Sequence, residues 1–332
     1  MSLPKVIVVC PPNGEPPPLG SLSEEAEFLI VRTADGLRAA QPGVEILFLN
    51  DFRTELLRMV GPGDLRWIHT SSIGVDALLT EEIIDSDLVV TSSRGVCERP
   101  IAEWVLGVLL MFVKDLRRTL EFQRAGQWVH RETEPLAGRR VLLLGAGPVG
   151  RETATLLRAA GMIVDVVGRR GREDPELCQI HAIAEIDELL PRADDVVLAL
   201  PLNKSTRQII DARRLALMQT GARLVNVGRG ALVDEAALLA AAQNGHLNAV
   251  ALDVFEQEPL PAGHPFWAMD NVLVSPHMSG DLVGWRSRVA DRFAANFRRW
   301  INGEPLADVV DIRDHGASAP ALVTSTLPIS GA

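Results

Sequence analysis

The stretch VLLLGAGPVGRETATLLRAAGMIVDVVGRR, residues 141–170, decides the fold of this chain. Its apolar beginning, Val141–Leu144, predicts a buried strand, and a glycine-rich loop, residues 145–150, follows directly. One face of the helix that this loop opens carries Val149, Thr153, Leu156 and Leu157. A second strand is expected at Ile163–Val167, so the stretch predicts a strand–helix–strand unit of a parallel sheet.

The three glycines of this loop have separate roles if the loop binds a dinucleotide. Gly145 permits the tight turn, Gly147 lets the backbone approach a pyrophosphate, and Gly150 lets helix and strand pack closely. The amides and the dipole at the start of the helix point toward the phosphates. Alone the pattern would be no more than a glycine-rich turn, but with both strands and the helix in place it predicts a dinucleotide-binding site.

The end of the second strand indicates which dinucleotide is preferred. An acidic residue there holds the ribose 2′-hydroxyl of NAD, but here Gly168 fills the position and Arg169 and Arg170 follow. Guanidinium groups pair with a 2′-phosphate, so NADP(H) is predicted to be preferred, with NAD(H) still possible. The alternative is that these arginines and Arg172 are solvated loop charges. Asp165 lies inside the strand, three residues too early to replace the missing carboxylate.

Apolar runs of strand length recur on both sides of this unit. Before it they lie at Val6–Cys10, Phe28–Val31, Val44–Phe48, Trp67–Thr70 and Leu88–Thr91. After it they lie at Val196–Leu200, Leu224–Val227, Val250–Asp253 and Val272–Ser275. Because helical segments separate these runs, two parallel sheets covered by helices are predicted.

Two helices have readable limits. Pro100 suits a first helical position, so a long helix is expected from Ile101 to about Gln123, with its most apolar stretch at Trp104–Val113. Asp234 can cap a second helix, expected over residues 234–244, and Gly245 can end it.

The last expected helix sets the domain organisation. It follows Gly280 and reaches about Trp300, with apolar side chains at Val283, Val289, Phe293, Phe297 and Trp300. The second sheet already has its strands, so this helix returns to the first domain. The prediction is an α/β chain with two doubly wound parallel-sheet domains, in which a Rossmann-type cofactor domain (99–280) is inserted into a flavodoxin-like substrate domain (1–98 and 281–316). Residues 317–332 are expected to form a disordered tail.

Composition narrows the class of protein. The 332 residues suffice for two domains, and 47% hydrophobic with 23% charged residues is ordinary for a globular enzyme. The net charge of −10 disfavours a nucleic-acid or anionic-membrane partner. The run Val6–Cys10 is too short for a signal-peptide core and Trp104–Val113 is too short to span a bilayer. Cys10, Cys97 and Cys178 show neither metal-ligand spacing nor a disulfide framework, so no metal and a reducing cytoplasm are expected.

Titratable side chains follow three strands of the second series. They lie in the segments VNVGRG (225–230), ALDVFEQEP (251–259) and SPHMSG (275–280). Ligands of doubly wound sheets bind beyond the carboxyl ends of the strands, so Arg229, Glu258 and His277 are expected to converge. Each of them alone could be ordinary, as a turn arginine, a solvated carboxylate and a loop histidine.

Taken together and in this order, the motifs resemble the D-isomer-specific 2-hydroxyacid dehydrogenase family. The resemblance covers about residues 65–303 and includes SIGVD (72–76), Ala102–Glu103, the loop 145–150 and PLNKST (201–206). It implies transfer of hydride from NAD(P)H to a small 2-oxo acid, giving a D-2-hydroxy acid, with a glyoxylate- or hydroxypyruvate-like substrate favoured. It also implies a homodimer, for which the apolar stretch Trp104–Val113 could supply the interface or could equally form interdomain core.

The resemblance implies roles for individual residues. Arg229 would bind the substrate carboxylate and carbonyl oxygen, and His277, paired with Glu258, would protonate that oxygen. The substrate carboxylate would meet the backbone amides of Ile73, Gly74 and Val75. The expected cofactor contacts are Gly145, Gly147, Pro148, Val149, Gly150, Arg169, Arg170, Leu200, Pro201, Thr206, Val227, Gly228, Asp253 and Gly280. Of these, Asp253 would face the nicotinamide carboxamide.

The chemistry requires these residue types. Hydride arriving at C2 leaves charge on the oxygen, so a proton donor and a fixed cation lower the barrier. A carboxylate beside the imidazole orients it and favours its protonated form. Gly228 stands where the family commonly has Ala or Ser, which could loosen the nicotinamide pocket.

Other functions stay open at this point. One is reduction of a larger branched or aromatic 2-oxo acid, and another is a non-catalytic NAD(P)-sensing binding protein of the same fold. A formate-oxidising relative is disfavoured, because such enzymes resemble this pattern but have glutamine at the position of Glu258.

Overall fold

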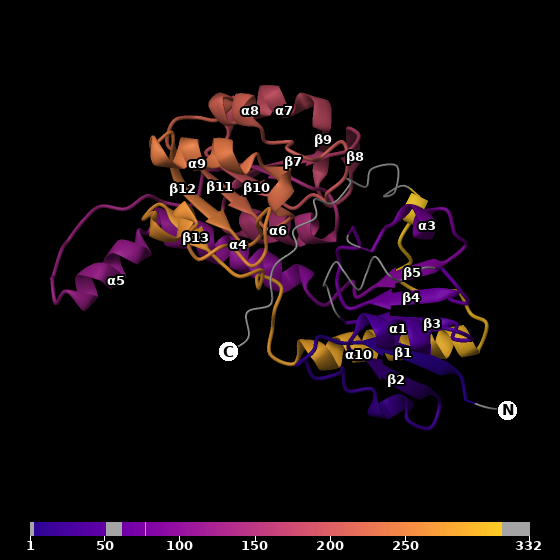
Figure 1. Ribbon diagram of the computed structural model, residues 1–332. Helices are drawn as coiled ribbons and strands as arrows, with labels where there is room; N and C mark the ends of the chain where they lie inside the picture. The colour runs from indigo at the N-terminus through magenta and orange to yellow at the C-terminus, as the bar shows by residue number, and fades with distance from the viewer. Residues whose placement is uncertain (1–2, 51–61, 77, 314–332) are drawn as a thin grey trace.

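The computed structural model describes residues 3–50, 62–76 and 78–313, which form two lobes, each built on one sheet (Figure 1). The smaller sheet is parallel and has the order β2-β1-β3-β4-β5. Its strands are β1 (Lys5–Val9), β2 (Glu27–Val31), β3 (Ile46–Leu49), β4 (Trp67–Thr70) and β5 (Val89–Ser92). This is the strand order of flavodoxin-like folds.

The larger sheet has the order β13-β12-β11-β10-β6-β7-β9-β8 and is parallel except for the β8–β9 pair at one edge. Its strands are β6 (Arg140–Leu144), β7 (Ile163–Gly168), β8 (Arg172–Asp174), β9 (Cys178–Ala182), β10 (Asp195–Leu198), β11 (Ala222–Asn226), β12 (Leu247–Leu252) and β13 (Val272–Val274). Counted from β6, the parallel strands follow the Rossmann order 3-2-1-4-5-6, extended by β13.

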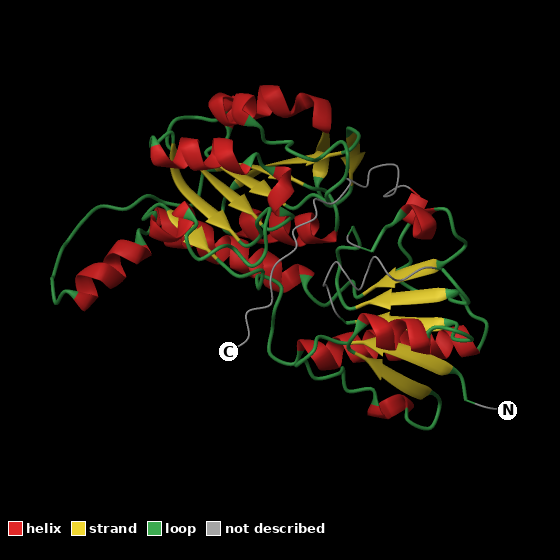
Figure 2. Cartoon of the chain, in the orientation of Figure 1, coloured by secondary structure: helices red, strands yellow, loops and turns green. Residues whose placement is uncertain are grey.

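Helices cover both faces of both sheets (Figure 2). The α-helices of the described chain are α1 (Ala34–Ala40), α3 (Glu81–Ile84), α4 (Glu98–Val113), α5 (Leu116–Arg124), α6 (Pro148–Ala159), α7 (Ile186–Leu189), α8 (Ala212–Leu217), α9 (Glu235–Gln243) and α10 (Trp285–Ile301). Short 3₁₀ turns lie at Gly20–Leu22, Ile183–Glu185, Leu190–Arg192, Gly230–Leu232 and Pro265–Ala268. As predicted, Asp234 caps α9 by accepting from the amide of Ala237.

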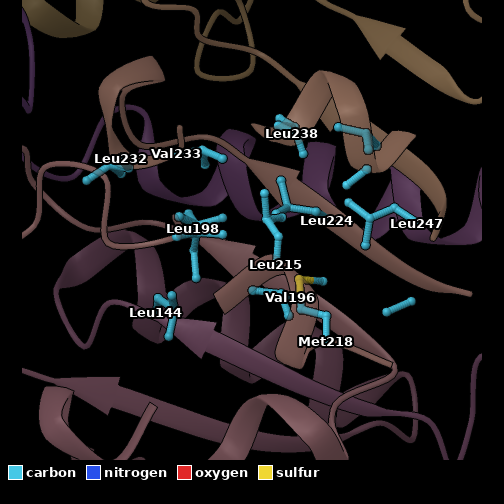
Figure 3. Close-up of a cluster of buried hydrophobic side chains, with 14 of the residues drawn as sticks. Leu144, Val196, Leu198, Leu215, Met218, Leu224, Leu232, Val233, Leu238 and Leu247 are labelled. Atoms are coloured by element: carbon cyan, nitrogen blue, oxygen red, sulfur yellow. The ribbon is translucent and has the colours of Figure 1, made fainter. Parts of the chain in front are cut away.

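Strand alternation divides the core of the larger sheet into two layers. Leu142 and Leu144 of β6 point to one face, where they meet side chains of β10, β11, α8 and α9 (Figure 3). Val141 and Leu143 point to the other face, where Val105 of α4 and further residues of α6 pack on them. Burial on both faces explains why these strands read as continuous apolar runs.

The last helix packs on the smaller sheet, as the sequence predicts. The ring of Phe293 in α10 stacks on Phe48 of β3 and Trp67 of β4, with centroid distances of 4.6 and 5.3 Å. Val289 and Phe297 belong to the same buried cluster. The chain therefore returns to its first sheet after completing the second, and the predicted fold class is confirmed.

Four local predictions need correction. The helix expected over residues 101–123 is broken at Asp115, whose φ of 47° is left-handed and whose main-chain carbonyl and carboxylate accept hydrogen bonds from Arg131. Helix α4 begins at Glu98, which makes Pro100 its third residue, still in the first turn where an amide hydrogen has no helical partner. Strands β8 and β9 were not expected. Val283, placed on the apolar face of the last helix, lies before α10 and is fully exposed.

Two expectations are limited by what the structure describes. The tail expected at residues 317–332 lies outside the described residues. Within the described ranges, no helix combines the length and apolar character that a membrane crossing requires.

Candidate active site

Three loops that follow neighbouring strands carry the titratable side chains of the site. Arg229 follows β11, Asp253 follows β12 and His277 follows β13, and these strands are adjacent in the sheet. The glycine-rich loop follows β6, two places away. The carboxyl ends of parallel strands meet at one edge, so the fold brings all four segments to the same side.

The backbone around Arg229 is held from two sides. The buried side chain of Asn226 donates to the carbonyl of Arg229 (2.8 Å) and accepts from the amide of Gly228 (3.0 Å). A Cβ on Gly230 would lie 1.9 Å from the carbonyl carbon of Phe255, so only glycine lets the two loops touch. The position of Arg229 thus depends on the loop that leads to Glu258.

The guanidinium of Arg229 reaches the other lobe. Its Nε donates to both carboxylate oxygens of Asp76, at 3.1 Å each, and its Nη2 lies 2.9 Å from Asp76 Oδ1. Its Nη1 donates to the Gly228 carbonyl at 2.8 Å. Burial works against the charge, but the carboxylates of Asp76 and, further off, Glu258 outweigh it and hold the pKa of Arg229 above its usual range.

His277 and Glu258 form a directly bonded pair. His277 Nδ1 lies 2.8 Å from Glu258 Oε2, and Glu258 Oε1 accepts from the Phe255 amide at 2.9 Å. The bond to Glu258 raises the pKa of His277 above its ordinary value, against burial and the charge of Arg229. Burial raises the pKa of Glu258, but the bonds from His277 and Phe255 outweigh it and hold that pKa below the usual range. The pair therefore favours imidazolium beside carboxylate, with Nε2 of the half-exposed ring left over as a proton donor.

The turn that presents His277 is fixed by a buried carboxylate. His277 itself has a φ of 52°. Asp253 is 1% exposed and accepts hydrogen bonds from the Ser275 hydroxyl (2.6 Å), the Met278 amide (2.9 Å) and the Ser279 amide (2.9 Å). Asp253 was expected to face a nicotinamide carboxamide; in the structure its oxygens hold the loop on both sides of His277.

The glycine-rich loop has the geometry that its sequence predicts. Gly145 has a φ of 132°, and a Cβ on it would lie 2.5 Å from the Ala199 carbonyl oxygen. A Cβ on Gly150 would lie 1.9 Å from the Gly145 oxygen, whereas one on Gly147 would meet no described atom within 4 Å. Helix α6 begins at Pro148, so its first amides border this open space. The space and the helix start fit a pyrophosphate.

The end of β7 carries the two expected arginines on the surface. Arg169 and Arg170 are exposed and follow Gly168, where a Cβ would press on Ile180 at 2.9 Å. Asp165 is engaged elsewhere, because its Oδ2 lies 2.6 Å from Arg140 Nη1. The described residues thus offer guanidinium groups and no strand-end carboxylate at this position.

The remaining predicted cofactor contacts line the same side. The Thr206 hydroxyl donates to the Pro201 carbonyl (2.7 Å) and closes the loop that follows Leu200 and β10. A Cβ on Gly228, which follows Val227, would lie 2.6 Å from a methyl of Leu232 and 2.8 Å from the Leu200 carbonyl oxygen. The side chain of Leu232 therefore occupies the space next to Gly228. A Cβ on Gly280 would meet Cys97 at 3.1 Å, at the start of α4.

The loop 72–76 supplies backbone donors from the smaller sheet. The Ser72 hydroxyl accepts from the Gly74 amide at 3.1 Å, whereas the amides of Ile73 and Val75 donate to no described residue. An ideal Cβ on Gly74 would lie 1.9 Å from Arg229 Nη2, so this loop touches the guanidinium directly. The structure brings these predicted substrate residues together with Arg229.

Three residues of the site were assigned no role from the sequence. Asp76 ends the motif SIGVD (72–76), and Asn226 and Ser275 lie within the segments 225–230 and 275–280. Their spacing gives no signal, because each acts through a partner fixed by the fold. Over residues 3–50, 62–76 and 78–313, no group of three His, Cys, Asp or Glu side chains is arranged to hold a metal ion.

Comparison with known proteins agrees with this geometry. The family model of the D-isomer specific 2-hydroxyacid dehydrogenase NAD binding domain matches residues 106–279, just over half of the chain. A glyoxylate reductase from Thermofilum pendens is 33% identical over 248 residues, which cover 73% of each protein.

Solved structures agree over nearly the whole length. A D-isomer specific 2-hydroxyacid dehydrogenase from Xanthobacter autotrophicus Py2, in complex with NADPH and MES, has a TM-score of 0.80 and 31% identity, covering 93% of this chain and 99% of that one. An NADPH-dependent glyoxylate/hydroxypyruvate reductase from Sinorhizobium meliloti, with NADP and sulfate, has a TM-score of 0.81 and 26% identity, covering 94% and 99%.

Proposed function

The chain belongs to the D-isomer specific 2-hydroxyacid dehydrogenase family, and we propose that it reduces a small 2-oxo acid of the glyoxylate or hydroxypyruvate kind with NADPH as the preferred hydride donor. Reduction of a 2-oxo acid by NAD(P)H is its activity. The observation that carries the proposal is the pair His277–Glu258, with a 2.8 Å bond, beside the guanidinium of Arg229.

The dinucleotide would be held by the loop 145–150, the first amides of α6 and the arginines after β7. Its nicotinamide, when bound, supplies the hydride that C2 of the substrate receives. The electron pair of the carbonyl bond then moves onto oxygen, and His277 Nε2 gives that oxygen its proton. Glu258 holds the ring by Nδ1 and stabilises the imidazolium before the transfer.

Arg229 and the amides of the loop 72–76 would bind the carboxylate and the carbonyl oxygen of the substrate. The amides of Ile73 and Val75, which donate to no described residue, suit one oxygen of the substrate carboxylate. The guanidinium suits the other carboxylate oxygen together with the carbonyl oxygen. As hydride arrives, the charge growing on the carbonyl oxygen faces a fixed cation, which lowers the barrier. The oxidation of a D-2-hydroxy acid uses the same groups in reverse.

Initial rates at 340 nm with purified protein, NADPH and either acid test this function. We expect turnover in the wild type and a loss of about 10²–10⁴-fold in kcat for His277→Gln. His246→Gln, whose ring is bonded to the Leu215 carbonyl, is the matched control and should keep the wild-type rate. Absence of turnover with these acids and with larger branched or aromatic 2-oxo acids would refute the reductase function and favour a binding protein.

The preference for NADPH rests on Arg169 and Arg170. Each charge-assisted bond to a 2′-phosphate contributes about 1.5–3 kcal/mol, so the double alanine variant should lose about 10²-fold or more in kcat/KM for NADPH. NADH, which lacks that phosphate, should lose little. The control Arg213→Ala removes an exposed arginine that is paired with Asp187 in the same lobe. Equal losses with both cofactors would rule out the phosphate contact.

We also propose a cytoplasmic homodimer that pairs through α5 and the segment after it. Helix α5 projects from the body of the larger lobe (Figure 1), and Leu116, Leu120 and Trp128 are exposed there, the last completely. The helix α4, by contrast, buries Val105 and Leu109 inside the lobe. Light scattering should give twice the chain mass, and a Leu120→Ser/Trp128→Ser variant should give a monomer.

The cytoplasm and the domain limits belong to the same proposal. Cys10, Cys97 and Cys178 are present as thiols, which suits a reducing compartment. The proposed limits are 1–98 with 281–316, and 99–280. The elements of the smaller sheet and of α10 fall within the first set and those of the larger sheet within the second.

A further inference from the structure

We propose that Asp76 is a positioning residue that decides which edge of the Arg229 guanidinium faces the substrate. This inference rests on the proposed function, in which Arg229 binds the 2-oxo acid. Asp76 belongs to the loop after β4 of the smaller sheet and Arg229 to the loop after β11 of the larger one. Their ion pair, with Nη2 2.9 Å from Oδ1, therefore joins the two lobes at the site itself.

The hydrogen bonds of Arg229 leave one edge of the group available. A guanidinium carries five N–H donors, one on Nε and two on each Nη. Nε is used by both oxygens of Asp76, which also lies against Nη2, and one donor of Nη1 is used by the Gly228 carbonyl. No described residue accepts from the other donors of Nη1 and Nη2. Both terminal nitrogens therefore keep a donor that two substrate oxygens can share.

The far end of the guanidinium lies on the main chain of the substrate loop. The distance of 1.9 Å between Nη2 and an ideal Cβ on Gly74 shows that no side chain fits between them. The amides of Ile73 and Val75, for which the described residues offer no acceptor, flank this contact. Asp76, three residues after Ile73 in the same short loop, thus fixes guanidinium and amides relative to one another. A carboxylate and a neighbouring carbonyl oxygen can then be bound by donors that do not have to move.

The negative charge of Asp76 separates a positioning role from a direct contribution to substrate binding. Its carboxylate, like that of Glu258, repels an approaching substrate anion, and both also act on Arg229. Removing the charge of Asp76 should therefore not weaken the attraction of the site for an anion. It should instead free the guanidinium to turn, which misplaces the charge that must meet the oxygen in the transition state. A loss in kcat without a comparable rise in KM is the expected signature.

The test uses Asp76→Asn in the full-length protein, with Asp187→Asn as the control. Asp187 also pairs with arginines, but on α7, away from Arg229. We expect kcat to fall about 10–100-fold while the KM for glyoxylate changes less than about threefold. Calorimetric binding of oxalate in the presence of NADP⁺, a readout without turnover, should be as tight as in the wild type or tighter. The control should match the wild type in all of these.

A second variant displaces the guanidinium without changing charge. In Gly74→Ala the new methyl overlaps Nη2, so kcat should fall at least as far as in Asp76→Asn. A kcat within twofold of the wild type in Asp76→Asn would overturn the proposal. So would a joint loss of kcat, oxalate binding and thermal stability, which would make Asp76 a structural residue only. If instead the wild type itself turns over no 2-oxo acid, the proposed function fails, and the oxalate comparison still tests the geometry.

Discussion

Alanine at Gly147 and at Gly150 should have opposite effects on this protein, although both glycines belong to one motif. The added methyl at Gly147 meets no described atom within 4 Å, and its φ of −78° and ψ of −174° are open to any residue. Gly147→Ala should leave the free energy of unfolding of the protein without cofactor unchanged or raise it by up to about 1 kcal/mol, because the unfolded chain loses freedom. The methyl would occupy the space expected for the pyrophosphate.

The loss of stability expected for Gly150→Ala follows from the contact of Gly150 with Gly145. A Cβ would lie 1.9 Å from the Gly145 oxygen, about 1.5 Å closer than an ordinary contact, and the neighbour is main chain at the end of β6. Inserting a methyl into packed structure costs about 1–3 kcal/mol, and a backbone neighbour places this case at the upper end. Alanine in a helix contributes about 1 kcal/mol over glycine, so Gly150→Ala should destabilise by about 2 kcal/mol.

Urea unfolding without cofactor and calorimetric titration with NADPH separate the two effects. Gly147→Ala should keep the unfolding midpoint but bind NADPH about 5–150-fold more weakly, the equivalent of a 1–3 kcal/mol misfit. Gly150→Ala should lower the midpoint. Gly107→Ala is the control and should keep the affinity, because Gly107 is exposed on α4 and its new methyl would meet no described atom of another element within 4 Å. Wild-type affinity in Gly147→Ala would refute the placement of the pyrophosphate, and an unchanged midpoint in Gly150→Ala would refute the packing argument.

Three further changes address the groups beyond the strand ends. Glu258→Gln removes the carboxylate that raises the pKa of His277, so this pKa should fall. Because reduction needs protonated His277, kcat/KM should begin to decline at a lower pH than in the wild type. An unshifted pH profile would contradict this. Asp253→Asn removes one acceptor from the loop around His277, so kcat should fall about tenfold or more while the affinity for NADPH is unchanged. Weaker binding of NADPH would instead indicate that Asp253 contacts the nicotinamide carboxamide. Gly230→Ala places a methyl 1.9 Å from the Phe255 main chain and should displace Arg229. We expect kcat/KM for glyoxylate, measured at saturating NADPH, to fall about 10²-fold.

The strands of both sheets were readable from the sequence because burial on both faces makes them continuous apolar runs. Strands β8 and β9 were not, since Arg172–Asp174 is wholly charged. That strand is held from outside, by Arg151 of α6, whose two terminal nitrogens lie 2.5 and 2.8 Å from the Asp174 carboxylate. The break at Asp115 has the same kind of cause, a bond from Arg131 sixteen residues away. Apolar periodicity is local, whereas these features depend on ion pairs made by the tertiary fold.

Some residues of the site, like some strands, could be predicted from the sequence, and others could not. Arg229, Glu258 and His277 could be predicted because hydride chemistry requires a cation and a proton donor at strand ends, and only a few such side chains stand there. What orients them could not be predicted, because Asp76 lies 153 positions from Arg229 and in the other sheet. The pattern shows which groups can react, and the fold decides which edge of each group is presented.

The carboxylates of the site explain how it can bind an anion without a large positive field. Arg229 and protonated His277 are each matched by a carboxylate, Asp76 and Glu258, and Asp253 adds a third behind the loop. Long-range attraction therefore contributes little, and recognition depends on short-range donors whose partners are already fixed. Such a site rejects an anion that does not place oxygens at the guanidinium edge and at the amides together, because an unmatched donor or acceptor gains nothing from net charge. Selectivity for a 2-oxo acid then follows from geometry that the two lobes hold jointly, through Asp76 from one side and the loop around Gly230 from the other.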